Sequence, residues 1–237
     1  MANRFGFCFL SAVPMRREAS HASEMVNQLL FGDGVEILAS VPEWLQVRSL
    51  FDGYCGWVSD KQLEVVYSLP ALDRTASDNI IVSYRNRNVL VPAGGCYSSL
   101  WAGDAEPLQD NDPVAVAERF MGSPYLWGGR TTMGIDCSGL VQVVYKICGC
   151  QLPRDASQQV ACGSEVAFDD ARPGDLAFFS NDAGRIVHVG IVAQDGGIIH
   201  SSGCVRRDRL TNEGVLNCER QHLTHRLSCL RRLPLGK

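Results

Sequence analysis

The strongest constraint on the fold is a change of pattern at residues 111–113, which read Asn-Asp-Pro. Aspartate at the N-cap and proline at the first helical position together form a helix start. Val114, Ala117, Phe120 and Met121 then follow at the spacing of one helix face. Upstream, residues 5–68 read as short strands broken by turns. The chain is therefore expected to join an all-β part to a part that begins with a helix.

The N-terminal part predicts a small β-barrel over residues 1–68. Strand-like runs at 35–39, 45–48 and 56–58 alternate with turn signals such as Gly32-Asp33-Gly34. Short strands at this close spacing are typical of small barrels. Residues 69–110 hold two further strand-like runs, at 80–84 and 89–91. This segment is either a linker or a reduced second barrel.

The bulk composition excludes several classes of partner. The chain has 237 residues, of which 20% are charged, and a net charge of −4. Nucleic acid is not expected as a partner, because phosphate binding needs a basic surface. No apolar stretch is long enough to span a bilayer. Residues 1–14 imitate a signal peptide, but their alternation and Pro14 fit a first strand better. The expected location is the cytoplasm; the alternative is export with the signal already removed.

The ten cysteines do not follow the spacing of a disulfide scaffold or of a metal site. Disulfide frameworks are typical of small secreted chains, and this chain is large enough to have a good core. No CxxC pair recurs, so no zinc site is expected. Most of these thiols are expected to be small buried hydrophobic residues. No metal and no cofactor is predicted.

Residues 111–237 predict an α+β domain. The apolar positions 140, 141, 143, 144 and 147 describe a buried helix that ends at Gly149. Strands are expected at 175–179, 188–192 and 197–201. A helix-first, sheet-second order is typical of an α+β domain. Arg154 and Asp155 are expected to fix the loop after the buried helix.

Cys137 differs from the other nine cysteines because it lies at the first turn of that helix. The unpaired amides and the dipole of a helix start favour negative charge, which is expected to lower the thiol pKa and supply thiolate near neutrality. A nucleophilic cysteine also needs a base and a group that orients the base. His188 and His200 follow on predicted strands and can take these two roles. Singly, each residue is more typical of packing, and only the ordered combination favours chemistry.

The spacing of the two histidines gives a structural test. Two side chains on adjacent antiparallel strands share a face only if their register has the right parity. His200 faces His188 when paired residue numbers sum to about 388 or 390. A tight two-residue turn would pair 194 with 197 and put the rings on opposite faces. A catalytic role for both histidines therefore predicts a wider loop or a bulge near residues 192–198.

Six motifs follow one another in the second half of the chain: Pro124-Tyr-Leu-Trp-Gly-Gly, Gly134-Ile-Asp-Cys-Ser-Gly-Leu, Leu152-Pro-Arg, Arg172-Pro-Gly-Asp-Leu, Val187-His-Val-Gly-Ile and Ile199-His-Ser. As an ordered set they resemble the NlpC/p60 family of cysteine peptidases. The resemblance covers residues 111–237. It implies a papain-like α+β fold with Cys137 as nucleophile, His188 as base and His200 as orienting residue.

The N-terminal part resembles a bacterial SH3-like domain, and this sharpens the family assignment. The combination resembles γ-D-glutamyl-L-diamino acid endopeptidases, which recognise a free N-terminal L-alanine and release L-alanyl-D-glutamate. The resemblance implies that Asp136 and Glu18 bind the substrate ammonium, with Tyr125, Ser138 and Tyr54 completing the pocket. Glu24 is an alternative to Glu18. Asp136 is equally well explained as the N-cap of the helix, and the two roles are compatible.

Three functions are consistent with the sequence. The first is a peptidase acting on murein peptides, with diaminopimelate and lysine both open as the diamino acid. The second is an acyltransferase or amidase built on the same papain-like chemistry. The third is a non-catalytic wall-binding protein, against which the intact set of one cysteine and two histidines argues. Cleavage of short peptides with a free N-terminal alanine would suit cell-wall recycling.

Overall fold

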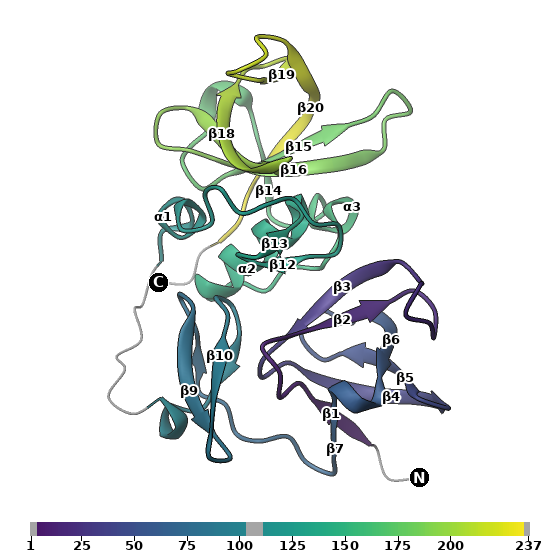
Figure 1. The fold of residues 1–237 in the computed structure, drawn as a ribbon. Coiled ribbons are helices and arrows are strands. Elements are labelled where there is room, and N and C mark those ends of the chain that lie inside the picture. The colour runs from purple at the N-terminus through teal and green to yellow at the C-terminus, as the bar shows by residue number, and fades with distance from the viewer. Residues whose placement is uncertain (1–3, 103–110, 235–237) are drawn as a thin grey trace. The chain divides into compact units, whose positions relative to one another are not determined.

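The computed structural model describes residues 4–102 and 111–234. Contacts divide the chain into two units, coloured along the sequence in Figure 1. The first unit comprises the described residues up to 102 together with Trp127–Thr131, and the second comprises the remainder. The domain boundary expected at residue 110 lies outside the described residues.

The first unit is built from short antiparallel strands, as the turn pattern predicted. Its main sheet has the strand order β3-β2-β6-β5-β4-β1-β7. The strands are β1 (Phe5–Phe7), β2 (Ala12–Arg16), β3 (Met25–Leu30), β4 (Gly34–Val41), β5 (Trp44–Ser49), β6 (Cys55–Ser59) and β7 (Glu64–Val66), with the 3₁₀ turn η1 (Asp60–Gln62) before the last. The N-terminal run expected as one strand forms two, because residues 8–11 leave the sheet between β1 and β2.

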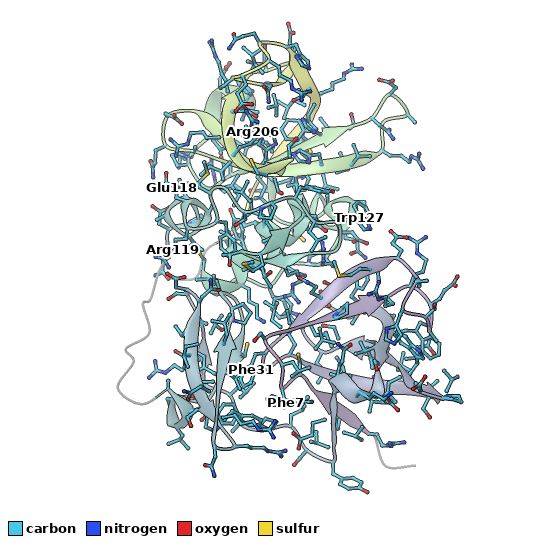
Figure 2. All side chains as sticks on the ribbon, viewed as in Figure 1. Phe7, Phe31, Glu118, Arg119, Trp127 and Arg206 are labelled. Atoms are coloured by element: carbon cyan, nitrogen blue, oxygen red, sulfur yellow. The ribbon has the colours of Figure 1, made fainter. Side chains whose placement is uncertain are left out.

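Residues 69–102 form two small two-stranded sheets. They pair β8 (Arg74–Thr75) with β11 (Cys96–Tyr97) and β9 (Ile80–Tyr84) with β10 (Arg87–Val91), and η2 (Ser99–Trp101) follows. Their buried side chains share one core with Phe7 and Phe31, which are labelled in Figure 2. The rings of Phe7 and Phe31 pack edge to face at 5.9 Å. This segment therefore contributes to the core of the first unit.

The segment Trp127–Thr131, which ends in β12 (Arg130–Thr131), packs within the first unit. Gly128 has φ +77°, and a Cβ there would lie 2.6 Å from the Met25 carbonyl oxygen, so only glycine fits. The Arg130 guanidinium is buried and lies 3.1 Å from the Asp33 carboxylate. A buried charge is tolerated only when it is paired, so this ion pair holds the segment in place.

The second unit combines three helices with a closed sheet. The helices are α1 (Pro113–Glu118), α2 (Cys137–Ile147) and α3 (Ala156–Gln159), with β13 (Gly134–Ile135) just before α2. The strands are β14 (Ser164–Val166), β15 (Leu176–Ser180), β16 (Ile186–Val192), β17 (Gly197–Ser202), β18 (Cys204–Leu210), β19 (Gly214–Leu216) and β20 (Leu223–Arg232), with η3 (Phe168–Asp170) after β14. The sheet order is β14-β20-β15-β16-β17-β18-β19, and pairing of β19 with β20 closes six of these strands into a barrel.

The local signals read from the sequence locate the starts of α1 and α2 correctly, but α1 ends at Glu118, Met121 beyond it is exposed, and α3 was not predicted. Asp112 caps α1 by accepting from the Val114 amide at 2.9 Å, and Pro113 is its first residue. Helix α2 is buried over nearly its whole length, and Gly149 follows its last turn with φ +78°. No helix among the described residues is long and apolar enough to cross a membrane.

The cysteines correct one expectation. All ten lie within the described residues, and all are free thiols. Only Cys8, Cys137 and Cys148 are buried, while Cys55 and Cys218 are exposed and the other five are half-buried. The expectation that most of them fill the core was wrong, because many lie on strand faces and turns that the barrels leave open.

Replacing Asp33 with leucine should destabilise the first unit by about 3–5 kcal/mol, because the buried Arg130 charge would lose its partner. Urea unfolding of the full chain measures this loss. Glu43→Gln is the matched control, since the Glu43–Lys61 pair is exposed and should contribute less than about 1 kcal/mol. Equal stability of both variants would contradict a structural role for the Asp33–Arg130 pair.

Candidate active site

Cys137 opens α2 and lies against β16. Asp136 is the N-cap and accepts a hydrogen bond from the Gly139 amide at 2.7 Å. The Cys137 side chain is buried, and the backbone amides of Val189 and Ser138 donate hydrogen bonds to its sulfur. Val189 is the residue after His188, so the nucleophile candidate lies beside the strand that carries the candidate base. The sequence analysis paired Cys137 with His188, and the fold places Cys137 beside the strand that carries His188.

Burial sets the protonation state of Cys137. Burial, with the nearby Asp136 carboxylate adding to it, raises the pKa of the thiol to about 11 although both amides and Arg154 act in the opposite direction. The expected thiolate near neutrality was therefore wrong, because desolvation outweighs the helix start. Cys137 rests as a neutral thiol that needs a base at the moment of attack.

The register between β16 and β17 confirms the parity prediction. Ile191 pairs with Ile199 and Val192 with Ile198, and both sums are 390. The Ala193 amide donates to the Gly197 carbonyl at 2.8 Å, which leaves a three-residue loop at 194–196. Gly196 adopts φ +75°, the left-handed conformation that such loops require. The wider loop puts His188 and His200 on one face, inside the barrel.

The two imidazoles form one hydrogen-bonded pair. His188 Nε2 lies 2.8 Å from His200 Nδ1, and both side chains are buried. This contact occupies Nε2 of His188, and Nδ1 lies outside it. Burial, followed by the effects of His200 and His225, holds the pKa of His188 well below 6.5. His188 is therefore a neutral imidazole at neutral pH.

Two residues beside this pair were not found by sequence reasoning. His200 Nε2 lies 3.1 Å from Asp208 Oδ2 on β18, and Asp208 is fully buried. His225 on β20 stacks on the His188 ring with centroids 4.1 Å apart and planes at 24°. Phe179 lies against both rings at 5.7 and 5.9 Å. The alternation Arg-x-Asp on β18 can be read in the sequence. The contacts of Asp208 and His225 depend on how the strands of the barrel pair, and the sequence does not show that pairing.

Asp136 and Ser138 belong to a buried charged network. Arg154 donates to both Asp136 oxygens at 3.0 and 2.5 Å and to the Ser138 hydroxyl at 2.8 Å. The Ser138 hydroxyl in turn donates to Asp136 at 3.2 Å. Arg154 therefore fixes the start of α2, rather than only the loop after the helix as expected. Any ammonium bound at Asp136 would join a carboxylate that Arg154 already engages.

The remaining substrate-binding candidates fall into two groups. Tyr125 belongs to the second unit, where its amide donates to the Gly203 carbonyl at 2.9 Å. Burial and the charges of Cys137 and Asp136 raise the pKa of Tyr125 to about 12, so its hydroxyl is a neutral donor near both residues. Glu18 and Tyr54 belong to the first unit, and their part in binding rests on the family resemblance alone.

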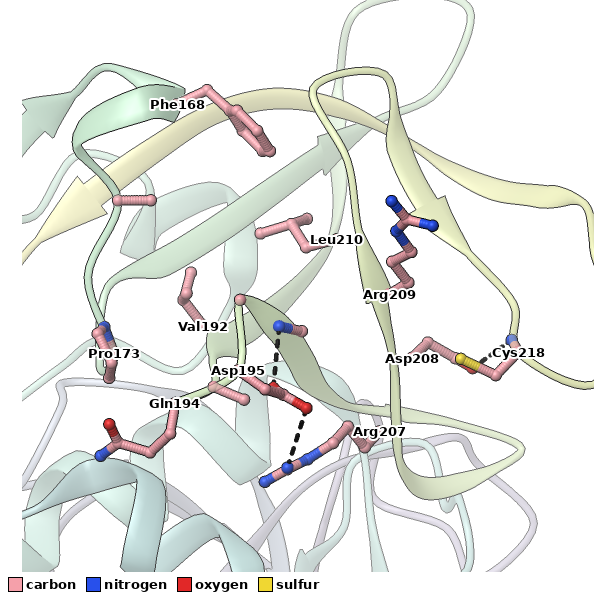
Figure 3. Close-up of a pocket in the computed structure, with 14 residues that line it drawn as sticks. Phe168, Pro173, Val192, Gln194, Asp195, Arg207, Asp208, Arg209, Leu210 and Cys218 are labelled. Carbon is pink, nitrogen blue, oxygen red and sulfur yellow. Dashed lines mark hydrogen bonds and ion pairs between the residues drawn. The ribbon is translucent and has the colours of Figure 1, made fainter.

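A separate pocket of about 660 Å³, shown in Figure 3, lies between η3 and the β17–β18 hairpin. Arg207 on its wall is engaged by Asp195 at 3.3 Å and by Glu118 at 2.5 Å. Asp208 contributes to this wall, while its carboxylate is hydrogen-bonded to the Cys218 amide and to His200. Because the pocket lacks Cys137, His188 and His200, it is not the candidate active site.

Comparison with known proteins agrees with this geometry. Residues 122–224 match the NlpC/P60 family model, and residues 15–63 match that of the bacterial dipeptidyl-peptidase SH3 domain. The γ-D-glutamyl-L-lysine dipeptidyl-peptidase of Bacillus subtilis (strain 168) is 33% identical over 211 residues, which cover 74% of this chain and 71% of that protein. The chain belongs to the NlpC/P60 family of cysteine peptidases. A γ-D-glutamyl-L-lysine dipeptidyl-peptidase from Bacillus cereus (strain ATCC 10987 / NRS 248) is 27% identical over 231 residues, which cover 77% of this chain and 68% of that protein.

The fold of this NlpC/P60 peptidase has a solved counterpart over its full length. The crystal structure of an NlpC/P60 family protein from Bacillus cereus ATCC 10987 superposes with a TM-score of 0.76 and 19% identity. The alignment covers 97% of this chain and 100% of that one. The pairing of an SH3-like β domain with an α+β peptidase domain is therefore the fold of this chain.

The buried histidines predict a loss of stability in mild acid. Burial lowers the pKa of His225 to about 4, and that of His188 is also lowered, so below pH 6.5 the unfolded chain takes up protons that the folded protein does not. The urea midpoint should be lower at pH 5 than at pH 7 in metal-free buffer. His225→Phe should reduce this loss by about 1 kcal/mol after allowance for solvent screening. His222→Phe, at an exposed histidine, should leave it unchanged.

Proposed function

We propose that the chain hydrolyses the bond between γ-D-glutamate and the diamino acid in murein peptides that carry a free N-terminal L-alanine. The observation that carries the proposal is the joined set of Cys137, held against β16 by the Val189 amide, and the His188–His200 pair at 2.8 Å. The Bacillus subtilis relative is a γ-D-glutamyl-L-lysine dipeptidyl-peptidase, and this likeness supports the proposed substrate class. The product would be L-alanyl-γ-D-glutamate.

In the proposed reaction, His188 Nδ1 takes the Cys137 proton as sulfur attacks the γ-carbonyl carbon of D-glutamate. The C–S bond forms, the C–N bond breaks, and His188 gives its proton to the leaving amine. Water then loses a proton to His188 and attacks the thioester, which breaks the C–S bond and restores the thiol. The neutral thiol and neutral imidazole make the first proton transfer part of the attack. The Cys137 amide at the helix start is the proposed donor to the oxyanion.

The N-terminal ammonium is proposed to bind at Asp136, Ser138 and Tyr125, with a carboxylate from the first unit. Because Arg154 engages Asp136, a second carboxylate is needed to balance the added positive charge. Glu24 is committed to Arg17 at 2.8 Å and to the Trp127 indole at 2.6 Å. The Glu18 carboxylate is exposed and has no side-chain partner among the described residues. Glu18 is therefore the proposed ligand, with Tyr54 as a further contact.

The leaving diamino acid is proposed to bind on the His188 side of Cys137, because the base must protonate the departing nitrogen. His225, stacked on His188, also lines a pocket of about 840 Å³ between the β15–β16 hairpin and β20. Asp182, Glu213 and Arg226 line the same pocket, and none is ion-paired among the described residues. Carboxylates and a guanidinium together complement a side chain that carries both an ammonium and a carboxylate. Diaminopimelate is therefore the proposed diamino acid, in preference to lysine.

Incubation with L-Ala-γ-D-Glu-diaminopimelate should release L-alanyl-γ-D-glutamate and free diaminopimelate, which mass spectrometry identifies. Cys137→Ala should abolish release, whereas Cys218→Ala, at an exposed cysteine, should retain it. N-acetylation of the alanine should strongly reduce turnover, because the ammonium ligands would lose their partner. Transfer of the acyl group to an added amine, with no hydrolysis in its absence, would instead favour the acyltransferase.

Arg226→Gln should lower kcat/KM for the diaminopimelate peptide about tenfold and leave the lysine peptide nearly unchanged, since only the former has a carboxylate to lose. Arg185→Gln is the control, because Arg185 is exposed in the β15–β16 hairpin and does not line the pocket. An equal effect of Arg226→Gln on both peptides would place the leaving group elsewhere.

A further inference from the structure

The carboxylate behind the two histidines has a specific setting. Asp208 is fully buried on β18, where Oδ2 lies 3.1 Å from His200 Nε2 and 2.9 Å from Arg206 Nε. Asp208 Oδ1 accepts from the Cys218 amide at 2.8 Å, and Asn217 Nδ2 lies 3.3 Å from Oδ2. The side chains of Asp208, Arg206 and His200 share one face, because Ile198 pairs with Asp208 and His200 with Arg206. Arg206 is labelled in Figure 2.

An ionised carboxylate can only accept hydrogen bonds, and this determines the protons on both rings. Burial alone would raise the pKa of Asp208, but the hydrogen bonds from His200, the Cys218 amide and Arg206 outweigh it and hold that pKa well below its usual range. His200 must therefore donate from Nε2, which leaves Nδ1 as an acceptor. His188 must then donate from Nε2 across the 2.8 Å contact, which leaves its Nδ1 lone pair for the thiol.

We propose that Asp208, with its charge compensated by Arg206, is a positioning residue that fixes the tautomer of His200 and, through it, that of His188. Asp208 contacts His200, and His200 contacts His188, so Asp208 would act on the proposed base through one intervening ring. This inference rests on the proposed roles of Cys137 and His188. It adds a residue that touches neither the thiol nor the substrate.

Arg206 explains why Asp208 does not simply draw a second proton onto His200. A lone buried carboxylate would stabilise an imidazolium at His200, and a charged His200 would donate from Nδ1 to His188. His188 would then carry its proton on Nδ1, facing the thiol, and would not act as a base. Arg206 already supplies the positive charge, at 2.9 Å from Oδ2, and is itself paired with Glu219 at 3.2 Å. A further titratable group that faces this cluster is His225 on β20, 5.7 Å from the His200 ring.

The test uses the full chain labelled with ¹⁵N-histidine, whose nitrogen shifts report directly which ring nitrogen carries the proton. In the unaltered protein the rings of His188 and His200 should each carry a proton at Nε2 and none at Nδ1. In Asp208→Asn the amide oxygen should face Arg206 and the Cys218 amide, so its NH₂ group donates to His200 and both rings change to the Nδ1 tautomer. Turnover of the murein peptide should fall by about 10²- to 10⁴-fold. Asp195→Asn, at an exposed carboxylate near the start of β17, should change neither readout.

Arg206→Gln gives a second reading that does not depend on Asp208→Asn folding. Without the guanidinium the carboxylate charge behind the two rings would be uncompensated, so the acid limb of the pH–rate profile should move upward by about one unit. A merely structural loss would lower the rate without moving the limb. Unchanged tautomers in Asp208→Asn, or an unmoved limb in Arg206→Gln, would overturn the inference. If no murein peptide is cleaved, the nitrogen shifts still decide the tautomer question, so failure of the proposed function is distinguishable.

Discussion

The pairing of Ile191 with Ile199 determines whether the two histidines of the site meet at all. Side chains alternate along a strand, so a shift of one residue would put His200 on the opposite face from His188. The three-residue loop at 194–196 and the positive φ of Gly196 hold the register at a sum of 390. Across the next strand Ile198 pairs with Asp208 and His200 with Arg206, a register with a sum of 406 that follows the turn at Gly203. The histidine pair and the carboxylate behind it therefore depend on two short turns.

Burial decides how this site starts its chemistry. A helix start favours thiolate, but Cys137 is buried next to the Asp136 carboxylate, and these two effects raise its pKa to about 11. The same burial holds His188 neutral. A neutral thiol and a neutral imidazole react slowly with electrophiles in general. In the proposed reaction they become a charged pair only as the sulfur attacks. The tautomer of His188 then matters more than its charge, because only a lone pair on Nδ1 can receive the thiol proton.

Local sequence signals predicted helices and strands of the second unit. The site residues that the sequence analysis missed reach the site through strand pairing between distant segments. The cap at Asp112, the helix after Cys137 and the loop near Gly196 each depend on neighbours within a few positions, which a sequence displays directly. Asp208 and His225 reach the site only because β18 and β20 belong to a barrel closed by β19. The raised pKa of Cys137 also needs three-dimensional burial. The sequence spacing of these residues does not indicate how deeply the Cys137 side chain is buried.

Asp136 has two structural partners within the second unit, and these limit what could bind there. As an N-cap it satisfies the Gly139 amide, and as a partner of Arg154 it belongs to a buried ion pair. An arriving ammonium would add positive charge to a network that is already balanced, so binding there is favourable only when another carboxylate enters with it.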